Sequence, residues 1–256
     1  MRLLLRLMLV GVLIMARGAP DDSNVKVGAD LYRLDDLAEL AVRIGSPVTY
    51  NRAGNVLLID GFEDGLNAWK QGLFGVGVEI VVSDERPYEG NVSCRMESGT
   101  GATPLAQINR FIPVHSECKM GVQVFFAPDD DLYSMRFGMI YDRAPTAHSF
   151  QINYRHTTGE LHYYTAGPAF LPLASPGIQY HDDANWHNMK LVVDTETGEY
   201  VRLYFDDVGY DMSGLLPYDQ VWAAGPMQYI SIQAWGTAIQ TGINYIDNVI
   251  VTYNEF

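Results

Sequence analysis

Polar side chains that could bind a ligand recur at every second position along three strand-like segments of the sequence. They are Ser134 and Arg136 in the first segment, Gln151, Asn153 and Arg155 in the second, and His162 and Tyr164 in the third. Successive side chains of a β-strand point to opposite faces, so each set lies on one face of its strand. In a later segment Gln233 and Trp235 share a face in the same way.

A surface of this composition suits a sugar. Amides and guanidinium groups pair with hydroxyls, and the apolar face of a pyranose stacks on an aromatic ring. If the four segments are neighbours, the sequence predicts a glycan-binding site formed by Arg136, Gln151, Asn153, Arg155, His162, Tyr164, Gln233 and Trp235. The alternative is an ordinary solvated sheet face, because antiparallel sandwiches commonly expose one polar face.

Two carboxylates, Glu63 and Asp247, lie near the two ends of the strand-rich region. In a two-sheet sandwich the first and last strands lie side by side, so these carboxylates can meet at one edge. Neighbouring carboxylates repel unless a cation lies between them, and oxygen ligands on loops suit calcium. We therefore expect a structural Ca²⁺ ion at Glu63 and Asp247, with hydrogen bonds at the strand ends as the alternative. The histidines and cysteines lack the spacing of zinc ligands.

The segments that must position these residues are β-strands. Alternation predicts strands over Met120–Phe126, Leu132–Tyr141, Phe150–His156, Leu161–Thr165, His187–Asp194, Tyr200–Phe205 and Tyr229–Trp235. The breaks at Ala144–Pro145 and Ala166–Gly177 indicate loops, the second long and apolar enough to cover a cleft. One helix is expected, over Leu34–Ile44, because its apolar residues recur at helical spacing. The fold class is thus all-β, a two-sheet antiparallel jelly-roll sandwich with a short N-terminal helix and hairpin.

The sequence also carries a resemblance to known β-sandwiches. Gly61 to Gly65, then Trp69 and the segments Val81–Glu85 and Tyr88–Met96, resemble the opening two strands of jelly-roll carbohydrate-binding modules. The run Trp186–Asp194, with Thr197–Asp206, is similar to the back-sheet hairpin of concanavalin A-like (laminin-G-type) sandwiches. Together these motifs cover about Leu58 to Thr252. The resemblance implies the fold, while such sandwiches host lectins, enzymes, adhesins and virion proteins alike.

Catalysis finds less support in the residues. Glycoside hydrolysis needs two carboxyl groups across one cleft, and Asp194–Glu199 departs from the Glu-x-Asp-x-x-Glu strand of concanavalin-like glucanases. In Gln151-Ile152-Asn153, asparagine stands where sandwich-type polysaccharide lyases carry histidine. On the polar face we expect no carboxylate and only His162 as a titrating base, without an orienting partner. The sequence therefore predicts no catalytic residues.

The first 57 residues are expected to lie outside the sandwich. Residues 1–19 have a basic start, a short apolar core and small residues before a cleavage point, which is typical of a secretory signal peptide. The alternative is that they are an extension upstream of a true start at Met15. Residues 20–57 form a helix and hairpin arm, and residues 58–256 the sandwich. The arm could attach the sandwich to a larger assembly or a second copy through residues 31–59, or the helix could cap the sandwich.

Composition limits the partners. With 17 basic and 31 acidic residues the formal charge is −14, which disfavours nucleic acid because phosphate binding needs a basic surface. The apolar segment at the start is too short to span a bilayer. The two cysteines, Cys94 and Cys118, form no disulfide framework and could be bridged or free.

These observations lead to one function hypothesis and two alternatives. We expect a non-catalytic module that recognises a glycan or a surface, secreted or displayed on a virion or other particle. A phage virion structural protein, anchored by its N-terminal arm, is the first alternative. A polysaccharide lyase or glycoside hydrolase is the second.

Overall fold

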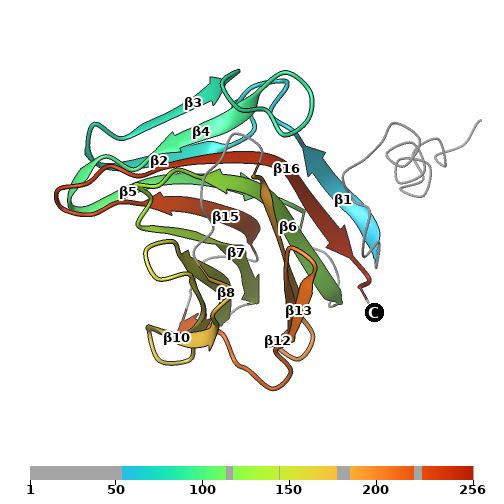
Figure 1. The fold of residues 1–256 in the computed structure, drawn as a ribbon. Helices are drawn as coiled ribbons and strands as arrows, with labels where there is room; N and C mark the ends of the chain where they lie inside the picture. Colours follow the sequence, from blue (N-terminus) through green and yellow to red (C-terminus); the bar gives the residue numbers. More distant parts are fainter. Residues whose placement is uncertain (1–53, 114–117, 144, 178–184, 222–226, 256) are drawn as a thin grey trace, which may run out of the picture. The chain divides into compact units, whose positions relative to one another are not determined.

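The described part of the chain is an all-β sandwich, as the alternation predicts. The computed structural model describes residues 54–113, 118–143, 145–177, 185–221 and 227–255. Sixteen strands and no helix are present in these residues (Figure 1). The expected signal peptide, the helix over Leu34–Ile44 and the first strand of the N-terminal hairpin lie outside them.

The strands form two antiparallel sheets of eight strands each. Sheet A has the order β13 (Val208–Asp211), β12 (Glu199–Phe205), β11 (His187–Asp194), β6 (Lys119–Pro128), β16 (Ile243–Tyr253), β4 (Ser93–Glu97) and β3 (Glu79–Ser83), with β1 (Asn55–Asp60) also paired to β16. Sheet B has the order β10 (Ala169–Ala174), β9 (Glu160–Thr165), β8 (Thr146–Arg155), β7 (Ser134–Arg143), β15 (Gln228–Trp235), β5 (Thr100–Phe111) and β2 (Lys70–Val76), with β14 (Tyr218–Val221) also paired to β8.

The first and last strands are neighbours. β1 pairs antiparallel with the second half of β16, from Asn55 opposite Tyr253 to Asp60 opposite Val249. β4 pairs with the first half of β16, from Ile243 to Ile246. The residues between the two halves, Asp247 and Asn248, therefore lie where one neighbouring strand replaces the other.

The core lies between the two sheets and is built from one face of each. In β7 the alternate residues Met135, Phe137 and Met139 are at most 1% exposed. Across the core, the ring of Phe126 in sheet A lies 5.9 Å from that of Tyr154 in sheet B. Such aromatic contacts add to the free energy gained by removing apolar surface from water.

A buried tyrosine also joins the sheets through hydrogen bonds. The hydroxyl of Tyr200, in β12, donates to the backbone oxygen of Tyr164 at 2.9 Å and accepts the backbone N–H of Gln151 at 2.9 Å. Burial raises the pKa of Tyr200, so the hydroxyl stays protonated and able to donate. This contact fixes β8 and β9, which carry much of the predicted site, to the opposite sheet.

One expected loop is a strand. The segment Ala166–Gly177 contains β10, an edge strand that pairs with β9. Its Pro172 lacks a backbone N–H and is tolerated because an edge strand leaves one side unpaired. The prolines and glycines at both ends of this segment are typical of loops. The sequence therefore did not predict the short strand between them.

The described tryptophans and cysteines differ in burial. Trp69 is in the core, where its indole N–H donates to Asp60 at 3.0 Å, and Trp186 is half-buried. Trp222 lies outside the described residues. Cys94 and Cys118 are both free, and Cys94 is fully buried. In the part of the chain that the structure describes, no helix is long and apolar enough to cross a membrane.

Candidate functional site

All the predicted ligand-binding residues lie on one face of sheet B, the face turned away from the core. The alternation places them there, because their sequence neighbours Phe137, Ile152 and Ile232 are in the core. We call this surface the polar face. Its predicted members are Arg136 on β7, Gln151, Asn153 and Arg155 on β8, His162 and Tyr164 on β9, and Gln233 and Trp235 on β15.

Five polar side chains form one continuous row across the polar face. The pairing register sets Gln107 opposite Gln233, Gln233 opposite Arg136, Arg136 opposite Asn153, and Asn153 opposite His162. Strands in a sheet lie about 4.8 Å apart, so the row is about 19 Å long. The sequence did not identify Gln107, because its strand, β5, showed no alternation strong enough to predict.

Arg136 is held at the centre of this row by aromatic rings. Its guanidinium carbon lies 3.9 Å from the ring centroid of Trp235 and 4.7 Å from that of Phe170. Burial lowers the pKa of Arg136 to about 10, so the guanidinium remains charged at neutral pH. Cation–π contacts of this kind restrict a side chain that would otherwise move freely. Phe170 comes from β10, the segment expected to be a loop.

The amides of the polar face are oriented by their neighbours. The side-chain N–H groups of Gln107 and Gln233 both donate to the hydroxyl of Ser231, at 3.1 Å and 3.2 Å. The indole N–H of Trp235 donates to the side-chain oxygen of Gln233 at 2.9 Å. On β8, the amide of Gln151 donates to the hydroxyl of Ser149 at 2.9 Å. These bonds reduce the entropy that the side chains would lose on binding a ligand.

His162 has a partner that the sequence analysis missed. Its Nε2 lies 3.1 Å from a carboxylate oxygen of Glu160, two residues earlier on the same face of β9. Asp142 also lies on the polar face, at the far end of β7 from Arg136. The expectation that this face carries no carboxylate was therefore wrong. Asp142 and Glu160 each lie one residue beyond the predicted end of their strand, so the prediction did not include them.

A pocket adjoins the polar face on the side of β14. Its volume is about 250 Å³, and its walls come from β5, β7, β8, β9, β14 and β15. It shares Gln107, Gln151, Tyr164 and Gln233 with the polar face. The ring of Tyr164 lies 4.9 Å from that of Tyr218 in β14 and 4.8 Å from that of Phe170. Tyr164 thus connects the pocket with the aromatic contacts around Arg136.

Glu63 and Asp247 are joined by one loop, between β3 and β4. The backbone N–H groups of Tyr88 and Glu89 donate to Asp247 at 2.9 Å and 3.2 Å. Further along the loop, the backbone N–H of Asn91 donates to Glu63 at 2.7 Å. This bond lowers the pKa of Glu63.

The backbone of β16 is irregular next to the buried Asp247. β16 bulges after Asp247, and Asn248 has a φ of 43°, a conformation that asparagine tolerates better than most residues. Asp247 is fully buried, and burial raises its pKa to about 6, with a smaller contribution from the charge of Glu63. The two carboxylates therefore interact electrostatically across the loop.

The donor set at this loop has the chemistry that calcium prefers, but the structure also offers the alternative. Hard oxygen ligands are available here from the carboxylates of Glu63 and Asp247 and from the side-chain amide of Asn248. The amide oxygen of Asn248 lies against Gly61. Within the described residues, however, no three His, Cys, Asp or Glu side chains are grouped as a metal site requires. Hydrogen bonds from the loop account for both carboxylates, so the calcium ion stays a prediction.

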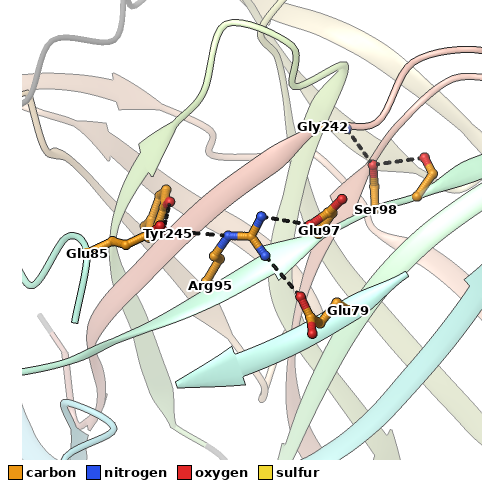
Figure 2. A network of polar contacts seen from close by, with 8 residues as sticks. Glu79, Glu85, Arg95, Glu97, Ser98, Gly242 and Tyr245 are labelled. Atoms are coloured by element: carbon orange, nitrogen blue, oxygen red, sulfur yellow. Dashed lines mark hydrogen bonds and ion pairs between the residues drawn. The ribbon is translucent and has the colours of Figure 1, made fainter. Parts of the chain in front are cut away.

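A second polar cluster lies on sheet A (Figure 2) and is structural. Arg95 in β4 pairs with Glu97 at 2.7 Å and with Glu79 in β3 at 3.2 Å. The hydroxyl of Tyr245 in β16 donates to Glu85 at 2.6 Å. Every group here has a partner within the cluster, so its role is to hold three neighbouring strands together.

The fold and the polar face define the class of protein. It has the fold of a two-sheet antiparallel jelly-roll β-sandwich, with one sheet that carries an organised polar surface. No protein-family model matches the sequence, and no curated protein matches it.

Solved structures agree with the fold at low sequence identity. Cellulose induced protein, Cip1, is 15% identical with a TM-score of 0.51, over 76% of this chain and 96% of that one. An endo-β-1,4-glucuronan lyase from the fungus Trichoderma reesei is 11% identical with a TM-score of 0.53, over 77% and 95%. A carbohydrate esterase from the Shiga toxin-encoding bacteriophage phi24B is 12% identical with a TM-score of 0.53, over 79% and 100%. At these identities the likeness shows the fold alone.

Proposed function

We propose that this protein binds a glycan on the polar face and does not catalyse its breakdown. The observation that carries the proposal is the row from Gln107 to His162 on five adjacent strands. Its side chains Gln107, Gln233 and Arg136 are partly exposed, whereas Asn153 and His162 are each only 3% exposed and complete the row beneath the surface. Planar amides and a guanidinium group suit the hydroxyls of a sugar chain, and Trp235 and Tyr164 offer rings for stacking.

The fold neighbours support a link to glycans only at the level of architecture. Their names include a lyase and an esterase that act on carbohydrates, and a protein induced by cellulose. Location outside the cell or on a particle rests on the N-terminal sequence and stays a prediction. A role in assembly through residues 31–59 likewise stays a prediction.

A second candidate, a polysaccharide lyase, is favoured by one observation. The contact between His162 and Glu160 gives the histidine an orienting partner, as a general base requires. Two features argue against it. His162 is only 3% exposed and does not line the pocket, so a polymer could not reach its ring without a rearrangement. Burial raises the pKa of Tyr164, which disfavours the phenolate that would be needed for a tyrosine base.

The proposal is tested by binding and turnover measured on the same protein. A glycan array with neutral and acidic oligosaccharides should give binding that Gln233→Ala and Gln107→Ala, which change partly exposed side chains, both weaken. Incubation with the polysaccharides that bind should release neither new reducing ends nor unsaturated uronic acids. Turnover that is lost in His162→Ala would replace the binding function by a lyase or hydrolase.

A further inference from the structure

Asp142 in the wall of the β14 pocket is a buried carboxylate whose oxygens have no hydrogen-bond partner among the described residues. The residue is 1% exposed. Its backbone is fixed, since its N–H donates to the backbone oxygen of Met227 at 2.8 Å. Burial raises the pKa of Asp142, and the nearby His148 opposes this only in part. A buried carboxylate with no partner is costly, so a cationic ligand that supplied the partner would be bound favourably.

The other walls of the pocket suit a positively charged group. Asp142 is the one charged side chain among the lining residues that the structure describes. Three tyrosines, Tyr164, Tyr218 and Tyr229, line the same space. Aromatic faces attract cations, and a carboxylate beside them adds a full opposite charge. His148 does not neutralise Asp142 directly, because its Nδ1 lies 2.7 Å from the carboxylate of Asp219.

Size and position connect the pocket with the glycan-binding surface. A volume of about 250 Å³ is below the roughly 300–1,000 Å³ of pockets for drug-sized ligands, so it fits a single small group. Gln151 and Gln233 belong to both the pocket and the polar face. A sugar residue of a chain on the polar face could therefore enter the pocket while the rest of the chain stays on the row.

We propose that the β14 pocket is a subsite for an amino sugar, whose ammonium group pairs with the carboxylate of Asp142. The tyrosine rings contact the sugar, and the amides of Gln151 and Gln220 bind its hydroxyls. This inference rests on the proposed glycan-binding function, because it assigns one sugar type to one end of the same surface. It does not depend on catalysis.

The test compares three tetrasaccharides that differ at one position of each sugar. Calorimetric titration at pH 6.5 uses the glucosamine tetramer, its fully N-acetylated form, and cellotetraose, which has a hydroxyl in place of the amine. The wild-type protein should bind the glucosamine tetramer at least tenfold more tightly than the other two. Asp142→Asn should remove this preference, so that it binds the glucosamine tetramer no more tightly than cellotetraose.

A matched control separates the pocket from the overall negative charge. The formal charge of −14 attracts any polycation, so the titrations are done in about 0.15 M salt, where the Debye length is about 8 Å. Asp207→Asn removes one exposed carboxylate at the turn between β12 and β13 and should keep the preference. Equal losses in Asp142→Asn and Asp207→Asn would overturn the subsite.

A second variant keeps the test valid if Asp142→Asn does not fold. Gln220→Lys places an ammonium group at the pocket wall, where it should pair with Asp142 and abolish the preference, whereas Gln220→Met should retain much of it. An unchanged preference in Gln220→Lys would contradict the inference.

The outcomes distinguish this inference from the function on which it rests. Binding of cellotetraose or other array glycans without a preference for the amine would overturn the subsite alone. No binding of any glycan would overturn both. If butylamine displaces the tetramer as well as monomeric glucosamine does, the pocket recognises amines in general and the assignment to a sugar is wrong.

Discussion

The guanidinium carbon of Arg136 lies 3.9 Å from the ring centroid of Trp235, at the centre of the polar face. We predict that Trp235→Ala weakens glycan binding, because the guanidinium loses a contact that positions it and the sugar loses a stacking surface. A cation–π contact contributes about 0.5–2 kcal/mol, so affinity should fall by about twofold to thirtyfold. Titration with an array-selected oligosaccharide measures this. Trp235→Phe, which retains a ring, should lose less than Trp235→Ala.

Arg155 tests whether the polar face binds a ligand or only faces solvent. It lies at the end of β8, on the same face as Asn153. Arg155→Ala should abolish glycan binding and change the melting temperature little, since a partly exposed side chain contributes little to folding. Arg86→Ala, outside sheet B, is the control and should bind normally. A large drop in melting temperature in Arg155→Ala would show a structural role instead.

Calcium at the β3–β4 loop is tested by removing it. An ion bound by Glu63 and Asp247 only in the folded state stabilises that state by mass action. Chelation with EDTA should then lower the melting temperature at neutral pH, and added calcium should restore it. Glu63→Gln should be insensitive to both. A melting temperature that is the same with calcium and with EDTA would leave the loop hydrogen bonds as the whole explanation of the carboxylate pair.

Asp142 predicts a dependence of stability on pH. Its pKa is raised in the folded state, so the folded protein holds this proton more tightly than the unfolded chain does. The stabilising contribution is therefore present at low pH and is lost as the pH rises through the folded pKa. Asp142→Asn lacks this loss, and we expect it to melt at a higher temperature than wild type at pH 7. The difference should shrink as the pH falls toward about 4, the usual range of aspartate.

An equal difference at all pH values would show that Asp142 does not titrate differently in the two states. Asp207→Asn is again the control, and its melting temperature should match that of wild type.

The buried ion pair of Lys190 and Glu255 predicts a large effect on stability. Their side chains approach to 2.7 Å, and both residues are at most 5% exposed. Glu255→Ala leaves the Lys190 ammonium buried without this carboxylate, which should lower the free energy of unfolding by about 3–5 kcal/mol. The double variant Lys190→Met and Glu255→Met removes both charges and should lose much less. Denaturant titration of both variants checks the prediction, and equal losses would contradict it.

The local alternation of the sequence was sufficient to predict β6, β7, β8, β9, β11, β12 and β15, but not β5 or β10. The structure confirms the all-β sandwich, and the strand predicted over His187–Asp194 has those bounds. The predicted ligand residues of any one strand share a face because period-two alternation is a property of neighbouring residues. That the four strands β15, β7, β8 and β9 are neighbours was shown only by the pairing in sheet B. The pairing of β1 with β16 followed from the general topology of two-sheet sandwiches.

The pairing of distant strands was decided only by the tertiary structure. Nothing near Gln107 in the sequence indicates that it lies opposite Gln233, or that Phe170 from a short edge strand contacts Arg136. Continuing the alternation of β7 from Arg136 would have placed Asp142 on the polar face. Its burial in a pocket could not be predicted from the sequence. Register and burial depend on contacts between residues far apart in the chain, whereas strand alternation depends only on adjacent ones. The sequence therefore determines which side chains share a face of one strand. The pairing of strands and the packing of the sheets determine which side chains of different strands contact one another.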